Sequence, residues 1–239
     1  MKESQKTSKE EIVKSYNEIH ASTNRLLETL SFYRWVLKKL DTEPGAELLD
    51  IATGLGRLLE VANEFGLWGY GVDISIKAVE RARAEHNQSC ICVGDGETLP
   101  FKDSSFDYVT NLGSLEHFLD IRAGVKEMCR VLKRNGLAAV FLPNSYYLVD
   151  IIRDVWWRGY GPSHGQIVER FATKLEWRDI LVANGLTVIQ TYKYNFFFPK
   201  NKLDWQAIKS HPYRILRPLI APLIPFNLSY SFLFICKRD

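Results

Sequence analysis

The stretch Leu48-Leu-Asp-Ile-Ala-Thr-Gly-Leu-Gly-Arg57 decides the fold of this 239-residue chain. A short apolar run, Glu47–Ile51, leads directly into a turn with two glycines, and apolar residues at helical spacing follow until Gly66. This order predicts a buried strand, a tight turn and a helix. At such a turn Gly54 and Gly56 let a ligand approach the backbone without meeting a Cβ atom.

The alternation of strand and helix continues along the rest of the chain. Further strands are predicted at Gly69–Asp73, Ser89–Val93, Phe106–Asn111, Leu137–Leu142, Thr187–Asn195 and Leu228–Lys237. Further helices are predicted from Ser75 to about Glu85, from Asp120 to Gly136, and from Thr173, which opens a capping box, to Gly185. Strands joined through helices form a parallel sheet with helices on both faces. The fold class is therefore α/β.

Three segments lie outside this alternation. Two helical stretches, about Lys9–His20 and Thr23–Lys39, precede the first strand and so cannot be crossovers. We expect residues 1–41 to form a helical cap over the carboxyl ends of the strands, where such sheets bind ligands. Residues 145–171 and 196–226 are expected as substrate-side insertions. Without repeats or a linker, residues 1–239 are expected to form a single domain.

Composition excludes several classes of protein. Hydrophobic residues at 46% and charged residues at 25% are typical of globular domains and exclude collagenous, coiled-coil and disordered chains. A formal charge of +3 is too small to indicate a nucleic-acid partner, and we expect none. The start of the chain lacks the apolar region of a signal peptide, and its four cysteines show no CxxC spacing. We therefore expect a cytoplasmic protein with free thiols.

Two acids near the glycine turn narrow the choice of ligand. Asp73 ends the second strand, nineteen residues after Gly54, where a carboxylate can accept both hydroxyls of a ribose. Leu59 stands where a dinucleotide site needs a small residue. Asp50, just before the turn, would repel a pyrophosphate but attract a cationic ligand such as a sulfonium. A nucleotide-like ligand is thus expected, and NAD is disfavoured.

With these motifs the chain resembles the class I S-adenosylmethionine-dependent methyltransferases, especially their small-molecule, ubiquinone/menaquinone-type branch. The resemblance covers about Glu47 to Asn144. Its motifs are Asp50–Gly56, GVDIS around Asp73, VGDGETLPF around Asp95, FDYVTNLGSLEHF at Phe106–Phe118, and LKRNGLAAVFLPN at Leu132–Asn144. It departs from the family pattern at Ala52, which replaces the usual first glycine.

The resemblance implies a Rossmann-like three-layer sandwich with a seven-stranded, mostly parallel sheet and an antiparallel last strand. It also implies S-adenosylmethionine as the cofactor, with S-adenosylhomocysteine as the product. In this chain the matching residues are Tyr16 near the cofactor carboxylate, Asp50, Ala52, Thr53, Gly54 and Gly56 in the first motif, Asp73, Ile74 against the adenine, Asp95 and Gly96 at the adenine amino group, and Asn111 and Leu112 at the methionine part.

Three residues are candidates for catalysis. Glu116 and His117 stand at the end of the fourth motif, where an acceptor should meet the methyl group. His117 is the better base near neutral pH, because the unperturbed pKa of histidine lies near 6.5. His164, in GPSHGQ, could also serve as a base or contact the acceptor, whereas His20 and His211 are expected at the surface. Alternatively, His117 packs or caps a helix and Glu116 holds a lid residue. No histidine–carboxylate cluster has metal-ligand spacing, so no metal is expected.

Residues 196–226 leave three interpretations open. They combine an aromatic triplet and five basic residues with an apolar Leu/Ile/Pro stretch, which suits contact with a membrane surface. They could equally form a lid over an apolar acceptor, or a structural insertion.

We therefore predict an enzyme that transfers a methyl group to a small or lipid-linked acceptor in an in-line displacement, with oxygen favoured over carbon or nitrogen as the methylated atom. It would be cytoplasmic or peripheral at the inner face of the membrane. A non-catalytic cofactor-binding regulator and, less favoured, an NAD-dependent oxidoreductase are the alternatives.

Overall fold

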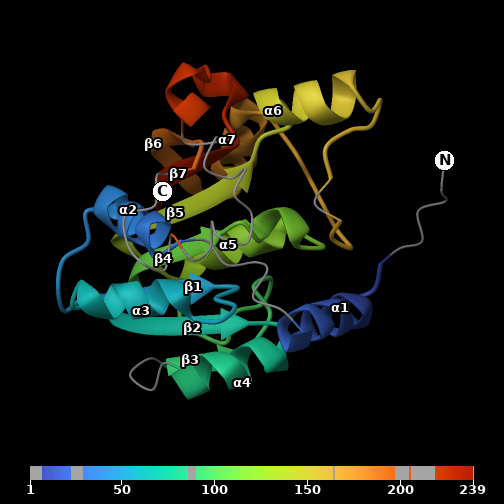
Figure 1. Cartoon of the computed structure of the whole chain (residues 1–239). Helices are drawn as coiled ribbons and strands as arrows, with labels where there is room; N and C mark the ends of the chain where they lie inside the picture. The colour runs from blue at the N-terminus through green and yellow to red at the C-terminus, as the bar shows by residue number, and fades with distance from the viewer. Residues whose placement is uncertain are drawn as a thin grey trace.

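A seven-stranded sheet runs through the computed structural model, which describes residues 7–22, 29–85, 90–163, 165–196, 205 and 219–238 (Figure 1). Its strand order is β3-β2-β1-β4-β5-β7-β6. The strands are β1 (Glu47–Ile51), β2 (Trp68–Asp73), β3 (Cys90–Val93), β4 (Phe106–Leu112), β5 (Leu132–Pro143), β6 (Leu186–Tyr194) and β7 (Ser231–Arg238). Only β7 runs antiparallel to its neighbours, β5 and β6. The predicted mostly parallel sheet with an antiparallel last strand is confirmed.

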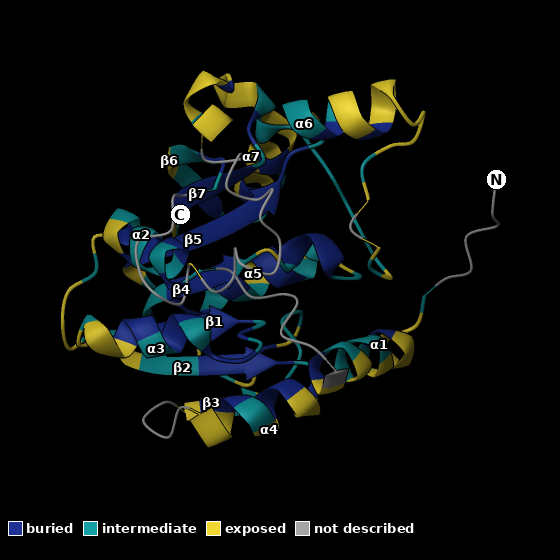
Figure 2. Cartoon of the chain, viewed as in Figure 1, coloured by how far each residue is buried: buried dark blue, intermediate teal, exposed yellow. Residues whose placement is uncertain are grey.

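Helices cover both faces of this sheet and make three layers. The helical segments are α1 (Lys9–Ser22), α2 (Leu30–Leu40), α3 (Arg57–Glu64), α4 (Ile76–Glu85), η1 (Leu115–His117), α5 (Ile121–Val131), α6 (Leu148–Asp150), η2 (Ile151–Trp156), α7 (Lys174–Ala183), η4 (Ala221–Leu223) and η5 (Phe226–Leu228). One apolar cluster joins α2, α3 and α4 to one face of the sheet, and another joins α5 and α7 to the other face. Figure 2 shows the strands as the most deeply buried part of the molecule.

Most predicted elements have their expected positions because their local signals are strong. Asp120 caps α5 by accepting from the backbone N–H groups of Arg122 and Ala123. Thr173 and Glu176 form the predicted capping box at the start of α7. The predicted helix that continued to Gly136 is wrong at its end.

The helix α5 stops at Val131, and Gly136 lies inside β5. Leu132 already has an extended backbone and pairs with Phe106 of β4. The pairing then shifts to Tyr108 with Leu137, so residues 133–136 form an irregularity in the strand. A Cβ atom at position 136 would come within 2.7 Å of the Asp107 carbonyl oxygen, so Gly136 permits close strand contact. Glycine here marks a strand irregularity and not a helix end.

The N-terminal cap is only half as predicted. The helix α1 does lie at the carboxyl ends of the strands, to the right of the sheet in Figure 1. The helix α2, in contrast, packs on a face of the sheet, with Phe32, Val36 and Leu37 in the apolar core. It begins at Leu30, after the N-cap Thr29. Part of the predicted Thr23–Lys39 helix falls outside the described residues.

Candidate active site

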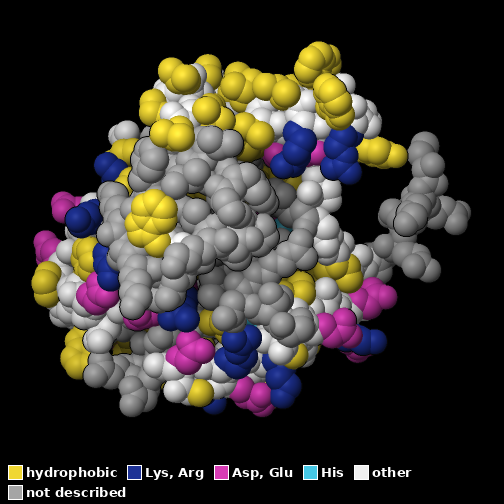
Figure 3. Space-filling model, viewed as in Figure 1, with side chains coloured by type: hydrophobic (Ala, Val, Ile, Leu, Met, Phe, Trp, Pro, Cys, Tyr) yellow, Lys and Arg dark blue, Asp and Glu magenta, His cyan; other side chains and the backbone are white. Residues whose placement is uncertain are grey.

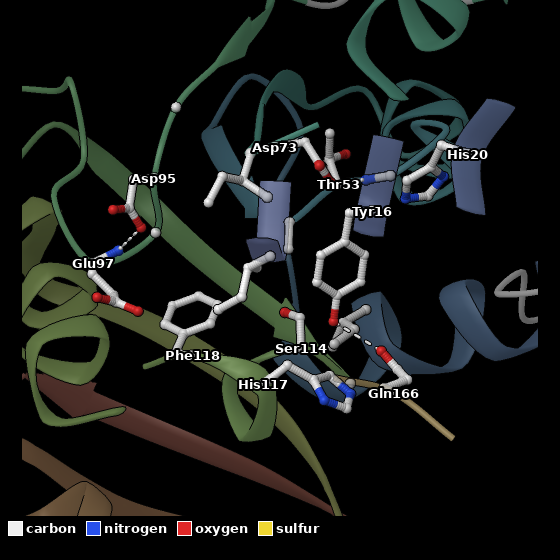
Figure 4. Close-up of a pocket in the computed structure, with 18 of the residues that line it drawn as sticks. Tyr16, His20, Thr53, Asp73, Asp95, Glu97, Ser114, His117, Phe118 and Gln166 are labelled. Atoms are coloured by element: carbon white, nitrogen blue, oxygen red, sulfur yellow. Dashed lines mark hydrogen bonds between the residues drawn. The ribbon is translucent and has the colours of Figure 1, made fainter. Parts of the chain in front are cut away.

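A cavity lies between α1 and the carboxyl ends of β1, β2 and β4, with a volume of about 1110 Å³ including its open mouth (Figure 4). The cavity is where a parallel sheet of this kind binds its ligand. Its lining is Lys9, Ile12, Tyr16, His20, Tyr33, Ala52, Thr53, Gly54, Leu55, Asp73, Ile74, Gly94, Asp95, Gly96, Glu97, Leu112, Gly113, Ser114, His117, Phe118, Leu119 and Gln166.

The glycine turn after β1 forms one wall of the cavity. Ala52, Gly54 and Gly56 have φ angles of 58°, 54° and 73°, in the left-handed region that favours glycine. The backbone N–H of Thr53 donates to the Val72 carbonyl at 3.1 Å, which ties the turn to β2. Ala52 therefore adopts a left-handed conformation that costs a non-glycine residue about 1–2 kcal/mol. Gly56 belongs to the turn but not to the cavity wall.

Asp73, at the end of β2, holds the turn in place. One carboxylate oxygen accepts from the Gly54 N–H and the other from the Ser75 N–H, each at 2.8 Å. Burial raises the pKa of Asp73, and these two backbone hydrogen bonds oppose that shift. The side chain also lines the cavity. Asp73 therefore organises the turn. Its contact with a ribose remains a prediction.

Asp95 lies further along the cavity and is bridged to α1. Its carboxylate pairs with the Lys9 ammonium, which is also 3.3 Å from Glu97. The backbone N–H of Glu97 donates to the other Asp95 oxygen at 2.9 Å. The Lys9 ammonium of α1 thus pairs with the same Asp95 carboxylate that is predicted to bind an adenine amino group.

The cavity has an apolar side around Phe118. A Cβ atom on Gly96 would lie only 2.4 Å from this ring, and one on Gly124 of α5 only 2.5 Å from it. Both glycines are therefore needed for the ring to fit between them. Phe118 and Ile74 both line the cavity. Together they give this part of the cavity the apolar character that a flat heteroaromatic ring requires.

Asp50 lies behind the turn and not in the cavity wall. Its carboxylate accepts a hydrogen bond from the Thr110 hydroxyl at 2.7 Å, which joins β1 to β4. Burial raises the pKa of Asp50 to about 7, although the Thr110 hydrogen bond opposes this shift. Its position does not support the direct contact with a cationic ligand that the sequence predicted. The acid instead links neighbouring strands beneath the turn.

The loop after β4 brings the remaining predicted residues together. Leu112 and His117 line the cavity, whereas the side chains of Asn111 and Glu116 are buried beside it. The Asn111 side-chain oxygen accepts from the Leu115 N–H at 2.9 Å and from the Ser114 hydroxyl at 2.8 Å. Asn111 thus shapes the loop that presents His117.

Glu116 is a buried carboxyl group in an unusual state. Burial raises its pKa to about 8 from an ordinary value of 4.5. One of its oxygens has no hydrogen-bond partner among the described residues, and the other is 3.7 Å from Nε2 of His117. Glu116 is therefore protonated over most of the neutral range and acts as a neutral neighbour of His117.

The ring of His117 is oriented by residues 145–171. Its Nδ1 atom is 2.5 Å from the Val168 carbonyl oxygen, and because a carbonyl can only accept, Nδ1 carries the proton. In the neutral ring Nε2 then has a lone pair. The side chain is buried at 7% exposure. His164, the third predicted catalytic residue, lies outside the described residues.

Sequence reasoning missed several residues that shape the cavity. Arg170 donates to the carbonyl oxygens of Glu116, Phe118 and Leu119 and so clamps the loop that carries His117. Gln166 accepts from the Tyr16 hydroxyl at 2.8 Å, which joins residues 145–171 to α1 (Figure 4). These contacts join segments distant in the sequence, and no local pattern indicates them.

His20 was predicted to lie at the surface, and that prediction is wrong. It is 7% exposed and lines the cavity, and the would-be Cβ of Gly54 lies 3.6 Å from its ring. Burial lowers the pKa of His20, and the nearby Asp73 opposes this shift. A signal did exist: Lys9, Ile12, Tyr16 and His20 are spaced by three or four residues and form one face of α1. His211 lies outside the described residues.

Comparison with protein families and curated proteins gives matches to methyltransferases. Residues 49–140 match the family described as a methyltransferase domain. A demethylmenaquinone methyltransferase of Corynebacterium urealyticum is 39% identical over 103 residues, which are 43% of this chain and 44% of the relative. The chain thus spans less than half of that relative's length. A Staphylococcus aureus protein of the same name is 28% identical over 72% of this chain and 77% of its own length.

Solved structures share the fold across most of the chain. A chain of the complex between the Haloferax volcanii Trm112 methyltransferase activator and a methyltransferase aligns with a TM-score of 0.68 and 20% identity, covering 94% of this chain and 97% of the other. The YcgJ protein of Bacillus subtilis aligns with a TM-score of 0.59 and 20% identity, covering 88% and 100%. Residues 49–140 are therefore a methyltransferase domain, within the Rossmann-like fold of the class I methyltransferases, for which S-adenosylmethionine is the cofactor.

Proposed function

We propose that this protein transfers a methyl group from S-adenosylmethionine to a small or lipid-linked acceptor of the quinone class in its reduced hydroquinone form, at a hydroxyl oxygen atom. The observation that carries the proposal is the position of His117. Its Nδ1 proton is directed to a backbone carbonyl, and the ring lines the same cavity as the glycine turn, Asp73 and Asp95. The site thus joins a nucleotide-binding wall to a candidate base.

The residues of the cavity fit the cofactor. The backbone of the glycine turn approaches the cavity without a Cβ at Gly54, and Thr53 of the same turn also lines the cavity. Asp73 and Asp95 would hold the ribose and the adenine amino group, Ile74 and Gly96 would flank the adenine, and Leu112 would face the methionine part. When bound, the cofactor supplies an electrophilic methyl group on a positively charged sulfur.

The chain's own residues would then position the acceptor and move one proton. A hydroxyl nucleophile loses its proton during the reaction, and Nε2 of His117 can accept it. Because Nδ1 is held by Val168, the ring keeps the required tautomer and orientation. Arg170 holds the loop by three carbonyl groups, which keeps His117 aligned with the nucleophile. Alignment supplies most of the rate in an in-line displacement.

The choice of acceptor class rests on the relatives. Demethylmenaquinone is the acceptor named for the similar proteins from Corynebacterium and Staphylococcus, and the proposal extends that quinone class to this chain. A demethylmenaquinone lacks a methyl group on a ring carbon, so the relatives support the acceptor class, and the choice of oxygen rests on His117 alone. No helix among the described residues is long and apolar enough to span a bilayer. We propose a cytoplasmic protein that works peripherally at the membrane's inner face. Most of residues 196–226, predicted to touch membrane or form a lid, lie outside the description.

The experiment separates cofactor binding from methyl transfer. Calorimetry with S-adenosylhomocysteine should show binding that Asp73→Asn weakens about tenfold or more, because charge-assisted hydrogen bonds contribute about 1.5–3 kcal/mol. Labelled methyl transfer to the reduced hydroquinone of a short-chain demethylmenaquinone should give a methyl ether and should fall about 10²–10⁴-fold in His117→Ala while S-adenosylhomocysteine affinity is kept. Asp103→Asn, at an exposed acid, is the matched control.

Three outcomes would contradict the proposal. Binding of NADH but not of S-adenosylhomocysteine would favour an oxidoreductase. Binding of S-adenosylhomocysteine without transfer to any quinone would favour a regulatory binder. Near-normal turnover in His117→Ala would remove the histidine from the role of base.

A further inference from the structure

The helical segment formed by α6 and η2 buries acidic side chains and exposes apolar ones, which is the reverse of a surface helix in a soluble protein. Asp150 and Asp154 are its buried residues, whereas Trp156 and the adjacent Trp157 are 76% and 81% exposed. Ile152 and Val155 are about half exposed as well. A surface helix of a globular protein normally buries its apolar stripe and exposes its acids. This reversal indicates that the outer side of the segment faces something other than water.

The charges of this segment are satisfied within it. Arg153 pairs with Asp150 at 3.0 Å and with Asp154 at 2.5 Å, and Arg158 pairs with Asp154 at 3.2 Å. The two arginines keep more than half of their side-chain surface exposed beside the apolar residues. The outer side is therefore apolar and aromatic, with basic groups at its border and no unpaired acid of its own.

A second apolar segment lies beside the first. Leu219, Ile220, Leu223 and Phe226 are exposed, Leu223 at 82%. The two segments start from the same edge of the sheet, because the Asn144 side chain donates to the Asn227 carbonyl oxygen at 2.9 Å and to that of Ser229 at 2.8 Å. Figure 3 shows hydrophobic side chains across the top of the molecule, over both segments, with basic side chains just below them.

We propose that this apolar ridge, formed by Ile152, Val155, Trp156, Trp157 and Tyr160 together with Leu219, Ile220, Leu223 and Phe226, inserts into the headgroup region of a lipid bilayer. Tryptophan and tyrosine favour the interface between water and hydrocarbon, and arginines at the border can reach lipid phosphates. Short segments that contain Pro222 and Pro225 allow only shallow insertion.

A bilayer fits these observations better than a protein partner does. The two tryptophans protrude, with 76% and 81% of their surface exposed, and a fluid lipid surface needs no complementary pockets. A protein interface, in contrast, ordinarily combines its apolar centre with specific hydrogen bonds. The formal charge of +3 is also compatible with an anionic membrane surface.

The ridge is connected to the site. Residues 145–171 carry the two tryptophans and also provide Gln166 to the cavity wall and Val168 to His117. A lipid-linked acceptor could therefore pass from the bilayer to the cavity along one segment. This use of the ridge rests on the proposed function. Binding to the bilayer through the ridge specifies the surface behind the peripheral location proposed above, and it can be tested without an acceptor.

Flotation of the full chain with vesicles of phosphatidylcholine and phosphatidylglycerol tests the ridge directly. The wild type should float with the vesicles, and the double variant Trp156→Ser, Trp157→Ser should lower the partition coefficient at least about tenfold. The matched control is Trp68→Ser, which removes a tryptophan that is 65% exposed at the start of β2. All variants should keep the wild-type melting temperature and S-adenosylhomocysteine affinity, which shows that folding and the cofactor site are intact.

The outcomes distinguish the ridge from other surfaces. Wild-type protein that stays unbound, or a double variant that floats like the wild type, overturns the proposal. So does a dimer at micromolar concentration that the double variant dissociates, because the ridge would then contact a second copy of the chain. Because the contact is mainly apolar, binding should persist at 0.5 M salt, and complete loss at that salt would also overturn it.

Discussion

The two N-terminal helices are neighbours in the sequence but are held in different ways. The helix α2 is held by apolar contacts: Phe32 packs edge-on against Phe141 and Tyr194, with ring centroids 4.9 and 5.0 Å apart. The helix α1 is held largely by polar contacts. Its Asn17 accepts from the Ser75 hydroxyl at 2.8 Å, and Arg81 donates to the His20 carbonyl oxygen at 2.6 Å.

The different contacts of the two helices indicate which helix can move. Most contacts of α2 lie in the apolar core, although its Tyr33 lines the cavity, so most of them are present whether or not a ligand is bound. Several contacts of α1 involve cavity groups, including Asp95 and Gln166, that a cofactor or acceptor would also touch. Because a ligand can replace such polar contacts, α1 is expected to open and close over the site while α2 stays fixed.

The largest expected effect is on the stability provided by α2. Phe32→Ala should lower the free energy of unfolding by about 3–5 kcal/mol, as truncation of a buried aromatic ring does. Phe32 is 1% exposed. Urea denaturation measures the change. Ile12→Ala, at a residue of α1 that is 5% exposed, should lower the free energy of unfolding clearly less. Equal losses in the two variants would contradict the difference between an apolar attachment of α2 and a polar attachment of α1.

The next effect is a pH dependence of stability, which arises from the buried Glu116 close to α1. Its pKa is raised to about 8, so the folded protein retains a proton that the unfolded chain loses near pH 4.5. The stability that this proton contributes is complete below pH 4.5 and is lost as pH rises toward 8. Glu116→Gln should therefore gain at least about 1 kcal/mol relative to the wild type between pH 5 and pH 8.

Thermal and urea unfolding at the two pH values measure this gain, with the exposed Glu80→Gln on α4 as the control. The charge of Glu116 acts on Tyr16 of α1, so its ionisation should loosen α1 first. Amide exchange, corrected for intrinsic rates, should rise with pH in α1 but not in α2. An identical pH response of Glu116→Gln and the wild type would show that Glu116 is not buried as a neutral acid.

The smallest effect concerns the link between α1 and residues 145–171. Tyr16→Phe removes the hydrogen bond to Gln166 and should weaken S-adenosylhomocysteine binding about two- to tenfold, since a net hydrogen bond contributes about 0.5–1.5 kcal/mol. The free energy of unfolding should stay nearly constant. Gln166→Ala and the double variant complete a cycle, and additive losses would show that the two side chains do not cooperate.

The sequence predicted the parts of the site that depend on local pattern. The turn at Gly54 and the acid at Asp73 follow from a strand, a turn and the end of the next strand, and both line the cavity. Asp95 and His117 come from motifs of the same region and line it as well. The sequence did not predict that the side chains of Asp50 and Asn111 lie outside the cavity wall. A side chain that points under a loop is indistinguishable in sequence from one that points into the cavity.

The alternation of strands and helices along the chain, the methyltransferase motifs and the helix caps at Asp120 and Thr173 follow from the sequence alone, because each depends on residues a few positions apart. Only the tertiary structure decided that α2 packs on the sheet, that His20 enters the cavity and that Arg170 holds the loop of His117. Those outcomes depend on contacts between segments separated by tens of residues. The favourable free energy of these contacts arises only when the distant segments meet in the folded protein, so no short sequence pattern predicts them.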